Sequence, residues 1–211
     1  MRTQEEETIN AYSHLLWCIG SFAILIGFLI DSSIAIKLKS SALIMLGLSS
    51  WTFFSSFLYH VTNEKKKMYN REIDKTSIYL MITGCGVAIN MATVDTLVAS
   101  ISCSVLLVLG SILLGIYTKN KTESEVFSLT SYILLGWLCI VPITGILGDN
   151  LYQEEINMHL IILGGILYSA GIFYYARDSI KWNHTKWHLF VMGGYCAHVF
   201  ALYRVIHISS V

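Results

Sequence analysis

Long apolar segments separated by short polar ones run through the whole 211-residue chain. Each is close to the roughly 20 residues that an α-helix needs to cross a bilayer. The pattern predicts seven spans, at about 14–31, 40–61, 74–93, 97–117, 126–146, 157–176 and 185–207. Backbone groups in the hydrocarbon core must pair within the protein, so these spans are expected to be helices. We therefore expect an all-α membrane protein in which residues 1–211 form a single seven-transmembrane helix bundle.

The composition supports a membrane protein and argues against a soluble one. Hydrophobic residues make up 55% of the chain and charged residues only 13%, against roughly 25% charged residues in a soluble domain. Lys plus Arg and Asp plus Glu number 14 each, so the charge balance gives no indication of a nucleic-acid partner. We expect a multi-pass protein of the cell or inner membrane, with membrane lipid as its surroundings. Its oligomeric state is left open.

The positive charges are unequally divided between the two ends of the predicted bundle. Eleven of the 14 Lys and Arg residues fall at the end where the chain begins. These are Arg2, Lys65, Lys66, Lys67, Arg71, Lys75, Lys119, Lys121, Arg177, Lys181 and Lys186. Loops on the cytoplasmic side carry the excess of Lys and Arg, so the sequence predicts a cytoplasmic N-terminus and, after seven crossings, an external C-terminus.

Several small residues carry expectations about packing. Gly164, Gly165 and Gly171 in the sixth predicted span are expected to let neighbouring helices approach closely. Pro142 is expected to kink the fifth span. The five cysteines all lie in apolar spans without a CxxC pair, so we interpret them as small buried hydrophobes and expect no disulfide framework.

Ionisable residues in or beside membrane spans are functional candidates because their burial is costly. Ser56 and His60 are four residues apart at the end of the second span, and His184 and His188 have the same spacing at the start of the seventh. Side chains four apart share a helix face, and two His at this spacing can reach one metal ion. Asp74 begins the third span. Alternating helix direction places all five residues at one membrane depth, on the cytoplasmic side.

This constellation has two interpretations. Three histidines with an open fourth position are typical of catalytic zinc sites, and Asp74 and Ser56 could then orient the water. Alternatively, histidines at span ends lie at the level of the lipid headgroups and bind no metal. A further histidine, His198, is about 15 Å beyond His188 along the same helix, where we expect it to make a polar contact between helices.

The chain resembles a known family in four segments. Glu7 to His14 (ETINAYSH) is similar to an E-x-x-N-x-x-x-H motif, and Ser56 to His60 (SFLYH) is similar to S-x-x-x-H, followed by an aspartate at Asp74. Gly136-Trp137-Leu138 and the segment from Gly164 to His198 extend the match over nearly the whole chain. These motifs resemble those of the hemolysin III family, within the progestin and adipoQ receptor superfamily that includes the adiponectin receptors.

The resemblance implies a zinc ion bound by His60, His184 and His188, with Asp74 and Ser56 contacting the water at the zinc. It also implies a structural hydrogen-bond cluster around Asn10 and His14 near the site. Two features depart from the family pattern. Asp74 is followed by Lys75 where the family usually has histidine, and Gly84 to Ala88 (GCGVA) replaces a G-T-Y-T-P-like stretch. The ligands are unchanged, but the cavity around the third and fourth spans is expected to differ.

Three functions are compatible with these features. The leading hypothesis is a zinc-dependent hydrolase of a lipid amide or ester, with Asp74 as general base and Ser56 holding the water or the oxyanion. The superfamily is similar to alkaline ceramidases in this arrangement, which makes a ceramide-like substrate the natural expectation. The first alternative is a lipid-responsive membrane protein in which zinc is structural. The least favoured is a haemolytic pore, because the sequence has neither a secretion signal nor an amphipathic pore-forming segment.

The charge asymmetry gives a direct test of orientation. A reporter fused after residue 211 should behave as external, and one inserted in the 62–73 segment should behave as cytoplasmic. The opposite labelling would reverse the orientation and place the histidines on the outer side of the membrane.

Overall fold

The computed structural model describes residues 2–93, 96–120, 125–141 and 158–208. Within these ranges the secondary structure is entirely helical. The seven helices are α1 (Gln4–Ile30), α2 (Ile36–Val61), α3 (Glu64–Thr93), α4 (Thr96–Asn120), α5 (Glu125–Leu138), α6 (Met158–Tyr175) and α7 (Asn183–Ile208). The expected all-α fold is therefore confirmed.

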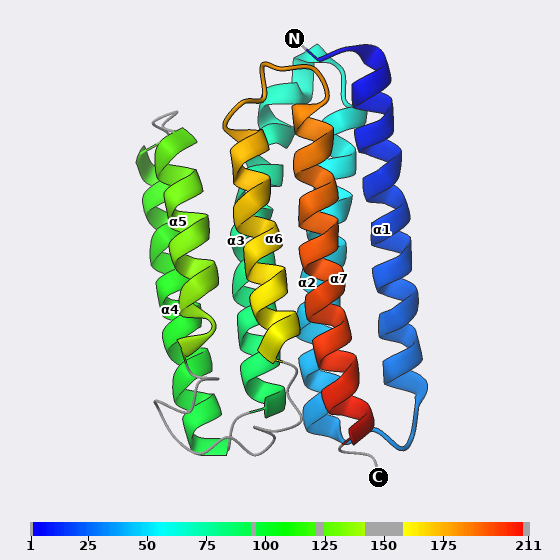
Figure 1. The fold of residues 1–211 in the computed structure, drawn as a ribbon, viewed down its shortest axis with the longest axis vertical. Coiled ribbons are helices and arrows are strands. Elements are labelled where there is room, and N and C mark those ends of the chain that lie inside the picture. Colours follow the sequence, from blue (N-terminus) through cyan, green and yellow to red (C-terminus); the bar gives the residue numbers. More distant parts are fainter. Residues whose placement is uncertain (1, 94–95, 121–124, 142–157, 209–211) are drawn as a thin grey trace.

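Consecutive helices run in opposite directions, so the two termini lie at opposite ends of the bundle (Figure 1). We refer to the end where the chain begins as the N-terminal end of the bundle. Helix α2 packs against α1 and α3, and α6 packs against α7, which also contacts α1 and α3. Helices α4 and α5 lie on one outer side of the bundle. Six helices are long and apolar enough to cross a membrane, and the described apolar part of α5, Phe127–Leu138, is shorter. The chain is a multi-pass integral membrane protein.

Two helices begin well before the spans predicted from hydropathy. α1 starts at Gln4 and α3 at Glu64, about ten residues earlier than expected in each case. Hydropathy detects only the apolar part of a helix, whereas the backbone can continue through polar turns when its end is capped. Thr3 and Glu6 form such a capping box at the start of α1. The additional polar turns of α1 matter because they carry side chains that reach the histidines.

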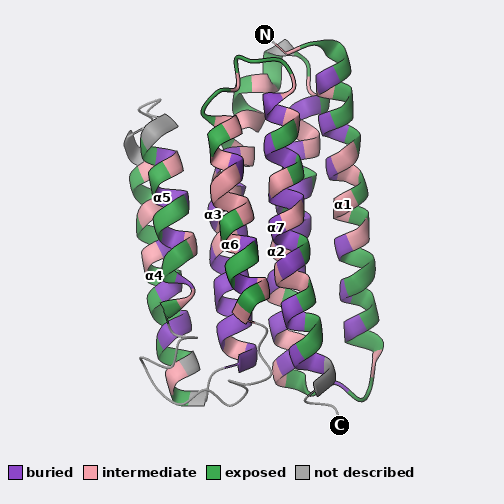
Figure 2. Cartoon of the chain, in the orientation of Figure 1, coloured by how far each residue is buried: buried purple, intermediate pink, exposed green. Residues whose placement is uncertain are grey.

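Exposed positions run along the outer faces of the helices (Figure 2), and many of them carry large apolar side chains, as in a protein surrounded by lipid. The core contains fully buried side chains such as Met45 and Phe53. Large apolar side chains also point outward along the helices, among them Leu16 at 70%, Phe22 at 56% and Leu134 at 58% exposed. Soluble proteins rarely show apolar surface on this scale, so the outer face is matched to hydrocarbon.

Gly164 and Gly171 bring α6 into close contact with α7, as expected, whereas a Cβ atom at Gly165 would make only ordinary van der Waals contacts with Trp137, the nearest at 3.5 Å. A Cβ atom at Gly164 would overlap the imidazole of His198 on α7, and one at Gly171 would lie 2.9 Å from side-chain atoms of Phe190 and Trp187. On α3, a Cβ atom at Gly86 would overlap the Cys139 side chain near the end of α5. The kink predicted at Pro142 lies outside the described residues.

The cysteines are free, but they are not all buried as predicted. Cys85, Cys103 and Cys139 are buried, whereas Cys18 is half-buried and Cys196 is exposed on the surface of α7. The interpretation failed at Cys196 because lipid-facing positions are as apolar as the core. An apolar span therefore does not distinguish the side of a helix that faces the protein from the side that faces lipid.

The contact at Gly86 should make this position intolerant of a larger residue. Gly86→Ala would place a methyl group only 2.7 Å from the Cβ atom of Cys139, which requires the backbones to move apart. We expect a loss of about 1–3 kcal/mol in stability, measured as a lower melting temperature in detergent. Gly47→Ala is the matched control, because a Cβ atom there meets nothing within 4 Å. Equal melting temperatures for both variants would contradict this packing.

Candidate metal centre

Four histidines from three helices meet inside the N-terminal end of the bundle. His14 comes from α1, His60 from α2, and His184 and His188 from the first turns of α7. All four are buried, with 3–5% of each residue exposed. Removing an imidazole from water is unfavourable unless its nitrogen atoms find partners, so the contacts of each ring decide what the cluster can do.

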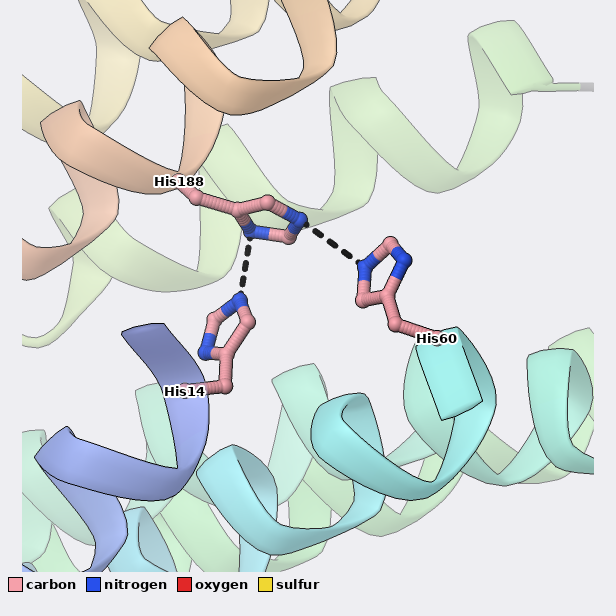
Figure 3. A group of neighbouring side chains, drawn as sticks. All are labelled: His14, His60 and His188. Atoms are coloured by element: carbon pink, nitrogen blue, oxygen red, sulfur yellow. Dashed lines mark hydrogen bonds between the residues drawn. The ribbon is translucent and has the colours of Figure 1, made fainter. Parts of the chain in front are cut away.

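His188 lies at the centre of the cluster and uses both of its nitrogen atoms (Figure 3). Its Nδ1 atom is 2.7 Å from Nε2 of His14. Its Nε2 atom is 3.1 Å from Nε2 of His60. Figure 3 shows the His188 ring between the other two, with His14 and His60 approaching opposite ring nitrogens.

His184 completes the cluster one turn before His188 on α7. Its ring centroid is 4.4 Å from that of His188 and 5.3 Å from that of His60. The Nε2 atom of His184 is buried and has no hydrogen-bond partner among the described residues. Its Nδ1 atom lies 3.1 Å from Oδ1 of Asp178, although the ring is not aligned well enough for a good hydrogen bond.

The Nδ1 atoms of His60, His184 and His188 each lie close to another polar side chain. Nδ1 of His60 lies 3.0 Å from Oε2 of Glu7, Nδ1 of His184 faces Asp178, and Nδ1 of His188 faces His14. A partner at Nδ1 fixes ring orientation and leaves Nε2 available to a metal ion. His60 and His188 have such a hydrogen-bond partner, whereas at His184 the Asp178 carboxylate is close but misaligned.

Arg2 connects the two carboxylates of this outer layer. Its guanidinium contacts Asp178 through Nε at 3.3 Å and Nη2 at 2.7 Å, and Glu7 through Nη1 at 3.3 Å. Burial opposes the charge on Asp178, but the nearby His184 ring and the hydrogen bonds from Arg2 outweigh it and hold the pKa of Asp178 well below its usual range. Asp178 is therefore a carboxylate acceptor at neutral pH.

The extended start of α1 makes further contacts with α7. The Glu6 side chain is buried and accepts a hydrogen bond from the backbone N–H of Trp182, just before α7. Thr185 donates to Oδ1 of Asn10 at 2.8 Å, and Asn10 is fully buried. The polar cluster expected around Asn10 and His14 is present, and it joins α1 to the helix that carries His184 and His188.

A cavity begins at this cluster and continues into the apolar part of the bundle. It measures roughly 1300 Å³ including its mouth, and its walls come from α2, α3, α5, α6 and α7. Its polar end is lined by Ser56, Asp74, His184 and His188, and its far end reaches His198. A ligand in this cavity would have polar groups at one end and an apolar chain along the rest.

The cluster could hold a metal ion. One nitrogen atom from each of His14, His60 and His188 lies within 4.8 Å of the others, and His184 adds a fourth ring with a free buried nitrogen. Imidazole nitrogens are good ligands for zinc and other transition metals. The donor set therefore fits a metal ion, and the three rings whose nitrogen atoms lie close enough together are His14, His60 and His188.

The structure places all the residues predicted from sequence around one site. His60, His184 and His188 are in contact with one another, and Asp74 and Ser56 line the cavity that starts there. The interhelical contact expected for His198 is confirmed, because its Nε2 atom lies 3.2 Å from the carbonyl of Ile161 on α6. The direct pairing of His14 with His188 and the roles of Arg2 and Asp178 were not predicted.

The helix arrangement and the buried histidines define a multi-pass membrane protein with a candidate metal centre at one end of the bundle. The model of the family described as haemolysin-III related matches residues 2–199, so the chain belongs to this family. Among its relatives, the hemolysin-3 homolog of Bacillus subtilis (strain 168) is 28% identical over 96% of this chain and 95% of its own. Hemolysin-3 of Bacillus cereus is 30% identical over 90% of this chain and 87% of its own.

Proposed function

We propose that His60, His184 and His188 bind a zinc ion through their Nε2 atoms and that the site hydrolyses an amide or ester bond of a membrane lipid. The observation that carries this proposal is the free, buried Nε2 of His184 beside the His60 and His188 rings, whose Nε2 atoms lie 3.1 Å apart. A buried nitrogen without a partner is unfavourable, and a metal ion would satisfy it.

The two nitrogen–nitrogen contacts of His188 differ in length, and this difference is our reason for treating His14 as an orienting partner and His184 as the third ligand. Two nitrogens bound to one tetrahedral zinc lie roughly 3.3–3.4 Å apart, given Zn–N distances of about 2.0–2.1 Å. The Nε2 atoms of His60 and His188 are close to that separation at 3.1 Å. His14 and His188 are at 2.7 Å, which is a hydrogen-bond distance. We therefore assign His14 as the partner that orients His188.

In this proposal the hydrolytic chemistry is assigned to Asp74 and Ser56, which line the polar end of the cavity. A bound zinc ion polarises a carbonyl group and lowers the pKa of water to about 7. Asp74 would take a proton from the attacking water while the water oxygen bonds to the carbonyl carbon of the substrate. Ser56 would donate a hydrogen bond to the developing oxyanion.

The remaining step returns the proton to the leaving group. When the bond between the carbonyl carbon and the nitrogen or oxygen of the substrate breaks, Asp74 would deliver its proton to that leaving atom. The products are a fatty acid and an amine or an alcohol. No oxidant or further reactant is needed, because water supplies both the hydroxyl group and the proton.

The form of the cavity supports a lipid substrate. Beyond the histidines its wall is largely apolar, with Ile78, Met81 and Ile172 among the side chains that line it. An acyl chain can lie there while its carbonyl reaches the polar end beside Asp74. A ceramide-like lipid satisfies both requirements, since it has an amide bond next to a long chain.

The zinc ligands can be identified by metal analysis of purified variants. Wild-type protein should carry about one zinc ion per chain, and His60→Ala, His184→Ala and His188→Ala should each lose most of it. His14→Ala should retain binding with affinity lowered roughly 10- to 100-fold, because it removes only an orienting partner. His159→Ala, at an exposed position on α6, is the control. Full zinc occupancy in His184→Ala together with none in His14→Ala would assign the other triad.

The hydrolase and the structural-zinc alternative differ in how they respond to Asp74→Asn. Asparagine keeps the shape and can accept a hydrogen bond, but it cannot take a proton. The variant should keep its fold and most of its zinc while losing activity about 10²- to 10⁴-fold. The assay is release of free fatty acid from a panel of lipid amides and esters in nanodiscs. If zinc-loaded wild type releases no more than Asp74→Asn across the panel, zinc is structural and the hydrolase proposal is wrong.

A further inference from the structure

We propose that Arg2 is a positioning residue for the metal centre: it holds Glu7 and Asp178, the carboxylates that face the outer nitrogens of His60 and His184, in one fixed arrangement. This inference rests on the metal centre proposed above and adds to it a determinant outside the ligand set. Arg2 belongs to neither the histidine pairs nor the motif segments of the sequence.

The Arg2 guanidinium donates hydrogen bonds to three side chains, those of Asp178, Glu7 and Tyr59. Nε and Nη2 approach the two oxygens of Asp178 at 3.3 and 2.7 Å, so this pair is bidentate. Nη1 reaches both Oε1 of Glu7 at 3.3 Å and the Tyr59 hydroxyl at 3.1 Å. Only 15% of the Arg2 side chain is exposed. Arg2 thus links α1, the end of α2 and the α6–α7 connection through a single planar group.

The planar geometry explains why this position requires arginine. A guanidinium offers several N–H donors in a rigid fork, whereas a lysine ammonium is a single point of charge on a flexible stem. A lysine at position 2 could pair with one carboxylate oxygen, but it could not hold Asp178 at both oxygens and Glu7 at the same time. The distinction between Arg and Lys therefore provides a test of geometry that keeps the charge.

The carboxylates held by Arg2 determine which ring nitrogens are free. Glu7 accepts from Nδ1 of His60 at 3.0 Å, and Asp178 is 3.1 Å from Nδ1 of His184. A carboxylate at Nδ1 stabilises the tautomer that has its proton there. Nε2 then carries the lone pair that a metal ion needs. Releasing either carboxylate would allow the ring to rotate or change tautomer.

The α6–α7 connection depends on this support. Trp182 has a φ angle of 69°, in the left-handed region, and is the one described non-glycine residue with positive φ. Such a conformation persists only where surrounding contacts impose it. Glu6 holds the Trp182 N–H, and Arg2 holds Asp178 four residues earlier. His184 follows Trp182 by two residues, so both contacts fix where its ring lies.

The experiment compares Arg2→Gln, Arg2→Lys and, as control, Arg177→Gln, which removes an exposed cation from the same connection. Zinc affinity is measured by competition with a chelator, and the visible spectrum of the cobalt-loaded protein reports coordination geometry. Arg2→Gln should lower zinc affinity roughly 10- to 100-fold and change the cobalt spectrum at saturating metal. Arg2→Lys should fall between wild type and Arg2→Gln, and Arg177→Gln should match wild type.

Histidine ¹⁵N spectra of metal-free protein give a second readout that does not depend on metal binding. Wild type should show His60 and His184 with the proton on Nδ1, and Arg2→Gln should convert both to tautomer mixtures. If Arg2→Gln proves too unstable, Asp178→Asn, which keeps the shape and removes the charge, should affect His184 and leave His60 unchanged. Signals are assigned with single histidine variants.

The outcomes separate this inference from the proposed function. A variant Arg2→Gln that melts earlier but keeps wild-type affinity, cobalt spectrum and tautomers would show that Arg2 only ties helix ends together, and the inference would be wrong. Wild-type protein that binds neither metal, yet loses its fixed tautomers in Arg2→Gln, would refute the metal centre and leave the positioning role intact.

Discussion

The N-terminal end of the bundle is organised by the need to satisfy the nitrogen atoms of four imidazoles buried together. Each ring carries one nitrogen that donates and one that accepts when neutral, and water is largely excluded from all four. Both nitrogens of His188 have an imidazole partner, His14 at Nδ1 and His60 at Nε2. His60 and His184 instead turn their Nδ1 atoms to carboxylates. Nδ1 of His14 and both nitrogens of His184 have no hydrogen-bond partner among the described residues, and both rings line the cavity.

This requirement accounts for the unusual length of α1. A helix that only crossed the membrane could begin near residue 14, where hydropathy places the span. The observed helix begins ten residues earlier, at Gln4. Those extra turns supply Glu6, Glu7 and Asn10, which contact α2, α7 and the connection before α7. The polar extension is therefore part of the site, and the apolar remainder of α1 faces lipid along much of its surface.

The fold could be predicted from the sequence because a bilayer allows few alternatives. Apolar segments of the right length must be helices, and short connections force neighbours to be antiparallel, which brings His60, Asp74 and His184 to one depth. The partners of the histidines could not be predicted in the same way. Asp178 lies in a polar connection where a carboxylate is unremarkable, and Arg2 carried only an orientation signal. Their contacts depend on how three helix ends meet in space, and the hydrophobic pattern of the sequence contains no information about that.

The spacing of the E-x-x-N-x-x-x-H segment becomes intelligible once its partners are known. Glu7, Asn10 and His14 are three and four residues apart and so form one stripe on α1, and each meets a different residue: His60, Thr185 and His188. The segment therefore specifies a junction of three helices that supports the histidines.

The departures from the family pattern fall on α3, where Lys75, Cys85 and Gly86 line the cavity. The contacts that hold the histidines are made by α1, α2, α7 and the α6–α7 connection. A change in α3 can thus alter the shape of the cavity while these contacts stay as they are.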